Sequence, residues 1–135
     1  MSDKSDKLKL AQERFGNDVY ATKTTGIEIV DVDYDYAKCQ MKINSRHCNA
    51  MGAVMGGAIY TLADFAFAIA ANMHELNTVS LSSNIVFMGQ PKGDTLIAEA
   101  KPIKVGAKVC HYHVRIADNL DKLVAEVTVS GFKTK

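Results

Sequence analysis

The chain has 135 residues, 47% of them hydrophobic, which is enough to build one core without disulfides or metal ions. Its 16 basic and 15 acidic residues leave a formal net charge of +1, which gives no long-range field to attract nucleic acid or an anionic membrane. Three widely spaced cysteines indicate a reducing compartment, so we expect a single cytoplasmic domain over residues 1–135 that binds no nucleic acid.

The first third of the chain predicts one short helix and two strands. The N-terminal residues alternate charged and small polar side chains, without the apolar stretch of a signal peptide. Leu8, Ala11 and Phe15 recur at helical spacing, which predicts a helix over residues 5–16. From residue 26 to 43 apolar and polar residues alternate on either side of a turn at 34–36, which predicts an antiparallel pair of strands.

Residues 56–74 form the longest apolar segment and predict one long helix. A membrane span is disfavoured, because Asp64 near the middle would cost about 2.5–3.5 kcal/mol on insertion. A helix without a polar face must be enclosed by protein, so we expect a buried helix and no membrane partner. Four strand-like runs follow, at 79–88, 95–103, 108–117 and 123–132. This order predicts an α+β fold in which an antiparallel sheet wraps around one long central helix.

Asp64 is the only acidic side chain between Arg46 and His74, and it lies too deep in the predicted helix to cap it. One interpretation is a structural carboxylate that accepts hydrogen bonds from its neighbours. The other is a carboxylate kept from bulk water, where it acts as a nucleophile or as a base for a water molecule. The helical pattern leaves both interpretations open.

Two further features could take part in such chemistry. Gly56 and Gly57 would let a ligand approach the unpaired N–H groups at the helix start, which can polarise a thioester carbonyl. The same glycines would also permit close packing against a strand. Strict alternation places Ser80, Ser82 and Asn84 on one strand face, where they could orient a water molecule or simply face solvent.

Two histidine-containing patterns carry little weight. His111 and His113 share a strand face at a spacing that can bind zinc, but no third ligand is evident and Arg115 beside them opposes a cation. His47 and Cys48 combine a base with a thiol, but neighbours in sequence seldom face each other. We therefore expect no metal site, no cofactor and no catalytic cysteine.

Residues 49–64 resemble the signature of the hotdog-fold thioesterases, Asn-x-x-Gly-x-x-His-Gly-Gly followed seven residues later by Asp. The resemblance is closest to the phenylacetic-acid-degradation (PaaI-like) thioesterases, and it continues through residues 18–29, 80–88 and 104–108. It implies a hotdog fold that hydrolyses an acyl-CoA thioester to the free acid and CoA. It also implies a homodimer, often assembled into a homotetramer, with active sites at the dimer interface.

The motif positions imply roles for individual residues. Asp64 is similar to the catalytic carboxylate of the family, and Gly56 to the residue whose backbone N–H binds the thioester oxygen. Asn49 is similar to a polar residue that steadies the site across the interface, and Ser80 to a hydroxyl that holds water. Gly57 belongs to the same substrate-binding turn.

The resemblance also implies which residues contact the acyl-CoA substrate. Lys104 and Lys108 are the lysines expected to bind the CoA phosphates, since lysine serves phosphate as a point charge.

Met55, which would also line the substrate site, stands where the family usually has His, and Met cannot accept a proton. If that His only shapes the pocket, hydrolysis persists with altered rate or substrate choice. If it is required, the chain is a non-catalytic acyl-CoA-binding or sensing module. A dehydratase is less favoured, because that reaction typically uses a His that this motif lacks.

Overall fold

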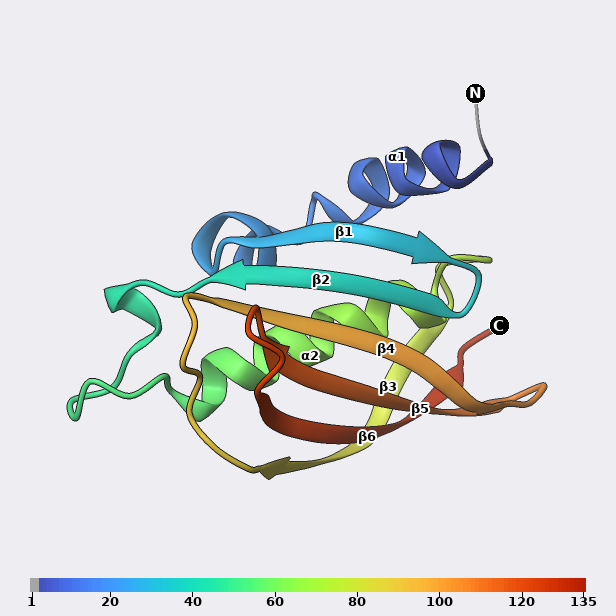
Figure 1. The fold of residues 1–135 in the computed structure, drawn as a ribbon. Helices are drawn as coiled ribbons and strands as arrows, with labels where there is room; N and C mark the ends of the chain where they lie inside the picture. Colours follow the sequence, from blue (N-terminus) through green and yellow to red (C-terminus); the bar gives the residue numbers. More distant parts are fainter. Residues whose placement is uncertain (1–2) are drawn as a thin grey trace.

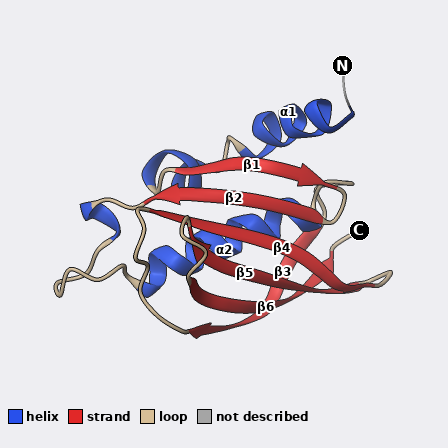
Figure 2. Ribbon diagram, viewed as in Figure 1, coloured by secondary structure: helices blue, strands red, loops and turns tan. Residues whose placement is uncertain are grey.

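Two helices and six strands make up most of residues 3–135, which the computed structural model describes; Met1 and Ser2 lie outside the described residues (Figures 1 and 2). In chain order the elements are α1 (Asp3–Phe15), a π-helical turn (Tyr20–Thr24), β1 (Ile27–Asp33), β2 (Tyr36–Lys42), a 3-10 turn (Ser45–His47), α2 (Gly56–Ala71), β3 (Thr78–Phe87), β4 (Thr95–Val105), β5 (Val109–Asp118) and β6 (Leu123–Lys133). All six strands occur where the alternation predicted them, with ends that differ by a few residues.

The six strands form one antiparallel sheet in the order β1-β2-β4-β5-β6-β3. The sheet curves around α2, and α1 lies beside β1 at one edge (Figure 1). The opposite edge is β3, which pairs with β6 on one side only. The predicted α+β fold, an antiparallel sheet wrapped around one long helix, is confirmed.

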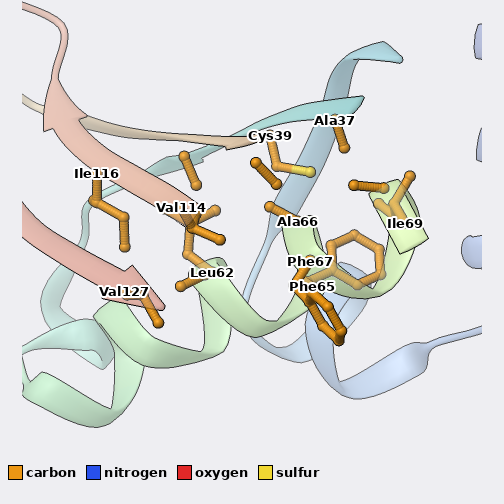
Figure 3. Close-up of a cluster of buried hydrophobic side chains, with 14 of the residues drawn as sticks. Ala37, Cys39, Leu62, Phe65, Ala66, Phe67, Ile69, Val114, Ile116 and Val127 are labelled. Carbon is orange, nitrogen blue, oxygen red and sulfur yellow. The ribbon is translucent and has the colours of Figure 1, made fainter. Parts of the chain in front are cut away.

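The core lies between α2 and the concave face of the sheet (Figure 3). Leu62, Ala66 and Ile69 of α2 are fully buried there. They face buried side chains of the central strands, namely Ala37, Cys39, Val114, Ile116 and Val127. Each large aliphatic side chain buried in this way contributes about 1.5–3 kcal/mol, so the helix is held firmly against the sheet.

The central helix ends at Ala71, three residues before the predicted end at 74. The helix ends there because the side chain of Asn72 forms hydrogen bonds with backbone groups on both sides of the helix end. Its Nδ2 donates to the carbonyl of Ala68 at 2.8 Å and to that of Thr78 at 3.1 Å. Its Oδ1 accepts from the N–H groups of Asn77 and Thr78. The amide therefore stops the helix and fixes the start of β3.

One side of α2 is open in the single chain, although most of the helix is buried. Gly57 and Asp64 are exposed, and Thr61 and Ala68 are half-buried. These positions recur along one side of the helix, which we call the open stripe. Gly, Ala and Thr on this side have small side chains, which bury little surface. No helix among residues 3–135 is long and apolar enough to cross a membrane.

The predicted polar row on β3 is also wrong, because the strand contains a bulge. Ser80 pairs with Gly131, but Ser82 pairs with Ser130, so Leu81 is an extra residue in the ladder. Directly paired residues share a face of the sheet. Ser80 therefore points to the helix side with Gly131, whose position is buried, whereas Ser82 and Asn84 point to the outer face.

Candidate active site

The N-terminus of α2 combines a closely packed glycine with an open one. A Cβ on Gly56 would lie 3.0 Å from the ring of Phe87 in β3, so this glycine does permit close packing. A Cβ on Gly57 would meet nothing within 4 Å, so its backbone is open to an approaching ligand. Met55 occupies the N-cap position, and its side chain makes no capping hydrogen bond. The first N–H groups of a helix have no partner within it, which leaves this end partly positive.

Two amide side chains hold the segment that leads into α2. Asn49 Oδ1 accepts hydrogen bonds from the N–H groups of Met51 (3.0 Å) and Ala53 (3.1 Å), which closes the loop on itself. The N–H of Val54 donates to Gln90 Oε1 at 2.8 Å, and Gln90 Nε2 donates back to the Val54 carbonyl at 3.3 Å. Sequence reasoning missed Gln90, because a polar residue in a loop after β3 gives no local sign of a distant backbone partner.

Asp64 lies on the open stripe, in the middle of α2. Within residues 3–135 its carboxylate forms no hydrogen bond and no ion pair. Burial of part of the group raises the pKa of Asp64, and the negative charge of Asp18 raises it further. Asp64 is exposed in the single chain. The expectation of a carboxylate kept from bulk water concerns a site shared by two subunits, and it stays a prediction. A structural carboxylate would have polar partners, and these contacts give Asp64 none.

The carboxylate and the helix N-terminus do not meet within one chain. Gly56 and Asp64 are eight residues apart on the same helix. At about 1.5 Å of rise per residue they are separated by about 12 Å along the helix axis. A general base must lie within hydrogen-bond reach of its proton, directly or through one water molecule. Within one chain Gly56 and Asp64 are therefore too far apart to act together on one ligand group.

Ser80 stands beside the middle of α2. The Tyr60 hydroxyl donates a 2.8 Å hydrogen bond to Ser83 Oγ, and Val79 lines a cavity with Ala68, so the strand between them runs past Asp64. Ser80 lies in that stretch and points to the helix side. In the described residues no hydrogen bond links it to Asp64. The pairing of Tyr60 with Ser83 was not predicted, because strict alternation placed Ser83 on the other face.

The structure does not bring Lys104 and Lys108 to the start of α2. The β4–β5 hairpin that carries them and the first turn of α2 lie at opposite ends of the molecule (Figure 1). Val105 of this hairpin lines a cavity with Ala71, the last residue of α2, and with His74 just beyond it. In a single chain these lysines therefore cannot serve a ligand bound at Gly56.

The histidines that sequence reasoning weighed have ordinary structural partners. His47 is buried, accepts from the N–H of Asn44 at Nδ1 (3.1 Å), and contacts the Thr25 carbonyl through Nε2 at 2.7 Å. Neither ring nitrogen is left to activate Cys48. His111 lies 3.0 Å from Ser130 Oγ, and His113 lies 3.5 Å from Glu126. Across residues 3–135, no three His, Cys, Asp or Glu side chains gather as a metal ion would require.

Comparison with known proteins decides the family. The model of the thioesterase superfamily matches residues 51–125, which include the start of α2, Asp64 and β3 to β5. The chain belongs to the thioesterase superfamily. The acyl-coenzyme A thioesterase PaaI of Escherichia coli K12 is 33% identical over 116 residues, covering 85% of this chain and 82% of that protein.

Other members of the superfamily match over less of their length. Acyl-coenzyme A thioesterase 13 of Homo sapiens is 30% identical over 100 residues, 72% of this chain and 69% of that protein. A curated relative from Archaeoglobus fulgidus is 35% identical over 98 residues, and the match spans only 64% of its length. The thioesterase fold is shared across the full chain: the E. coli PaaI structure superposes with a TM-score of 0.87 at 25% identity, covering 97% of this chain and 96% of that one.

A structure with a bound ligand gives the same fold. A thioesterase protein from Streptococcus pneumoniae, solved with coenzyme A, superposes with a TM-score of 0.80 at 22% identity. The superposition covers 91% of this chain and 96% of that chain. At this identity the similarity establishes the hotdog architecture of the superfamily.

Proposed function

We propose that this protein hydrolyses an acyl-CoA thioester to the free acid and CoA. Asp64 supplies the carboxylate, acting as base for a water molecule or as nucleophile. The N–H of Gly56 donates a hydrogen bond to the carbonyl oxygen as this oxygen gains negative charge, and Gly57 leaves room for the substrate beside it. Ser80 steadies the water molecule, and Asn49 holds the loop that leads to the helix.

The observation that carries this proposal is the position of Asp64 in α2 and its environment there. It is the one acid of α2, and its pKa is raised by burial and by Asp18. Partial desolvation of a carboxylate costs the fold free energy, which is understandable where chemistry needs the group. The raised pKa also improves a carboxylate as a base near neutral pH, since efficiency is greatest when the pKa approaches the working pH.

A second copy of the chain completes the site. The exposed side chains of β3 and of the residue that follows it include large apolar ones, Val79 (51%), Leu81 (61%), Val86 (48%), Phe87 (52%) and Met88 (49%). We propose that a partner covers this edge with its own β3, so that the two α2 helices run antiparallel along their open stripes. Asp64 of one subunit then faces Gly56 of the other, which removes the separation of about 12 Å along a single helix.

The same arrangement brings in the remaining predicted contacts. An antiparallel partner places its β4–β5 hairpin nearer to the first turn of α2, which lets its lysines at positions 104 and 108 meet the CoA phosphates. Assembly of two such dimers into a homotetramer and a cytoplasmic location stay predictions. The three free cysteines, two of them buried, support a reducing compartment.

Met55 favours a second candidate, a module that binds acyl-CoA without cleaving it. Its side chain is 53% exposed at the N-cap of α2, beside the proposed carbonyl site. A thioether accepts only weak hydrogen bonds and cannot take up a proton. A protein that binds an acyl-CoA tightly and releases no thiol would establish this alternative.

The deciding experiment compares thiol release by wild type and Asp64→Asn over a panel of acyl-CoA thioesters. The amide keeps the volume but removes the charge, so turnover should fall by about 10²- to 10⁴-fold. Binding of an S-alkyl-CoA thioether, a non-hydrolysable analogue of the acyl-CoA, should persist. Glu28→Gln, which neutralises an exposed carboxylate on β1, is the matched control. Full activity in a folded Asp64→Asn protein would remove Asp64 from the mechanism.

Thermal melting of the same samples separates catalysis from structure. The folded-state pKa of Asp64 is raised, so its contribution favours folding below the unfolded pKa and is lost as the pH rises through the folded value. Near neutral pH the charged group therefore opposes folding. Asp64→Asn should melt at the same temperature as wild type or higher, whereas loss of a structural carboxylate would lower it.

A further inference from the structure

A cavity of about 380 Å³ opens beside the first turn of α2. Its wall is formed by Tyr20, Thr24, Thr25, Arg46, His47, Met55, Gly57, Ala58 and Thr61. It therefore adjoins the N–H groups proposed to bind the thioester oxygen. The residues come from the π-helical turn, the 3-10 turn and α2 of the same chain, so folded segments back the cavity. Its volume is at the small end of ligand pockets, which are about 300–1,000 Å³.

Arg46 is the one permanently charged side chain among these lining residues. Its guanidinium lies over Gly26, where an added Cβ would come within 3.1 Å of Nη2. Throughout residues 3–135, no carboxylate forms an ion pair with it. The cavity thus contains a cation that the protein itself does not neutralise.

The other polar groups of the wall are already engaged or neutral. The Thr61 hydroxyl donates to the Gly57 carbonyl at 2.8 Å, and both ring nitrogens of His47 contact backbone atoms. Tyr20 and Met55, 67% and 53% exposed, provide apolar surface. An occupant that matches this wall has a short apolar stretch and an anionic end, since a guanidinium pairs best with a planar carboxylate through two hydrogen bonds.

We propose that this cavity receives the acyl group, and that Arg46 selects acyl groups ending in a carboxylate, that is, the monothioesters of short dicarboxylic acids. The proposal rests on the proposed thioesterase function and names its substrate class. The cavity adjoins the proposed carbonyl site directly. The CoA phosphates are separated from the thioester by the whole pantetheine arm, so Arg46 is poorly placed for them.

Four substrates test the assignment: the glutaryl and pentanoyl thioesters of CoA and of N-acetylcysteamine, which lacks the phosphates. Wild type should prefer glutaryl over pentanoyl on both carriers. Arg46→Gln should lower kcat/KM for both glutaryl thioesters by about tenfold to a hundredfold, mainly through KM, because a hydrogen-bonded charge pair is lost. Both pentanoyl thioesters should be unaffected. Arg46→Lys, which keeps the charge without the fork, should fall between the two.

Lys23→Gln is the matched control, because Lys23 is an exposed cation of the same π-helical turn that does not line the cavity. It should leave the ratio of glutaryl to pentanoyl turnover unchanged. A loss in Arg46→Gln that follows the CoA carrier, whatever the acyl group, would mean that Arg46 binds phosphate and would overturn the proposal. An equal loss on all four substrates, or a wild type without preference for glutaryl, would overturn it too.

Binding measurements separate this proposal from hydrolysis. S-(4-carboxybutyl)-CoA and S-pentyl-CoA are thioethers that no thioesterase can cleave, and calorimetry gives their affinities directly. Tighter binding of the carboxylated thioether by wild type, lost in Arg46→Gln, supports the role of Arg46 even if no thiol is released from any thioester. Equal affinities in a protein that does hydrolyse thioesters would refute the role of Arg46 and leave the proposed function intact.

Discussion

Asp18 lies close enough to Asp64 for its negative charge to raise the pKa of the Asp64 carboxyl, in addition to the larger effect of burial. The base form of Asp64 is lost as the pH falls through this raised value, so activity should decline on acidification earlier than an unperturbed carboxyl would cause. Asp18→Asn removes the repulsion and should move this decline to lower pH, with the plateau unchanged. Profiles of kcat/KM against pH measure the shift. Glu13→Gln, an exposed acid of α1, should leave the profile in place.

Gln90 is predicted to hold the start of α2 in position. Gln90→Met keeps the length of the side chain but removes both hydrogen bonds to Val54, which should cost about 1–3 kcal/mol of stability. A misplaced helix start should also lower kcat/KM by up to about 10²-fold. Chemical denaturation and thiol release measure the two effects. Gln40→Met, which loses one exposed hydrogen bond to Glu28, is the control and should change neither.

The shared-site arrangement predicts a stable dimer at micromolar concentration in sedimentation experiments. Leu81→Asp places a charge on the exposed edge of β3, where the side chain is 61% accessible, so folding should survive while pairing fails. Activity should be lost together with the dimer. Leu120→Asp, at an equally exposed position in the turn before β6, should remain dimeric and active. A wild-type monomer with full activity would refute the shared site.

Met55→His should preserve folding and either raise turnover or change substrate choice, because it restores the usual family side chain at the helix start. The side chain is exposed and lines the proposed acyl cavity, so an imidazole fits without disturbing the core. Met51→His, 86% exposed in the same loop, controls for a histidine nearby. Unchanged activity and specificity would show that position 55 is only pocket wall.

Local patterns predicted most of the fold. Alternation and turn residues located the six strands, and apolar spacing located α2, because both report on which side chains face the core. The end of α2 was missed, since the role of Asn72 depends on Thr78, which reaches it only in the folded chain. The motif indicated the positions of Gly56 and Asp64, and the structure adds that Asp64 lies on the open stripe while Gly56 packs against Phe87.

The parts of the site that sequence reasoning missed depend on long-range pairing. The bulge at Leu81 changes which serines face α2, and it exists only because β3 pairs with β6 in a shifted register. Gln90 finds its partner 36 residues away. The cavity around Arg46 is assembled from three separate segments, and no local pattern indicates that they meet. Each of these features is a property of contacts between elements rather than of any one element.

The separation of Gly56 and Asp64 along one helix also has a consequence for mixed populations of subunits. In the proposed dimer each subunit lends its carboxylate to one site and its helix N-terminus to the other. A subunit carrying Asp64→Asn still offers an intact N-terminus, so a hybrid dimer keeps one working site of its two. A mutant subunit would then abolish only the site to which it contributes residue 64, and the other site of the hybrid dimer would stay active.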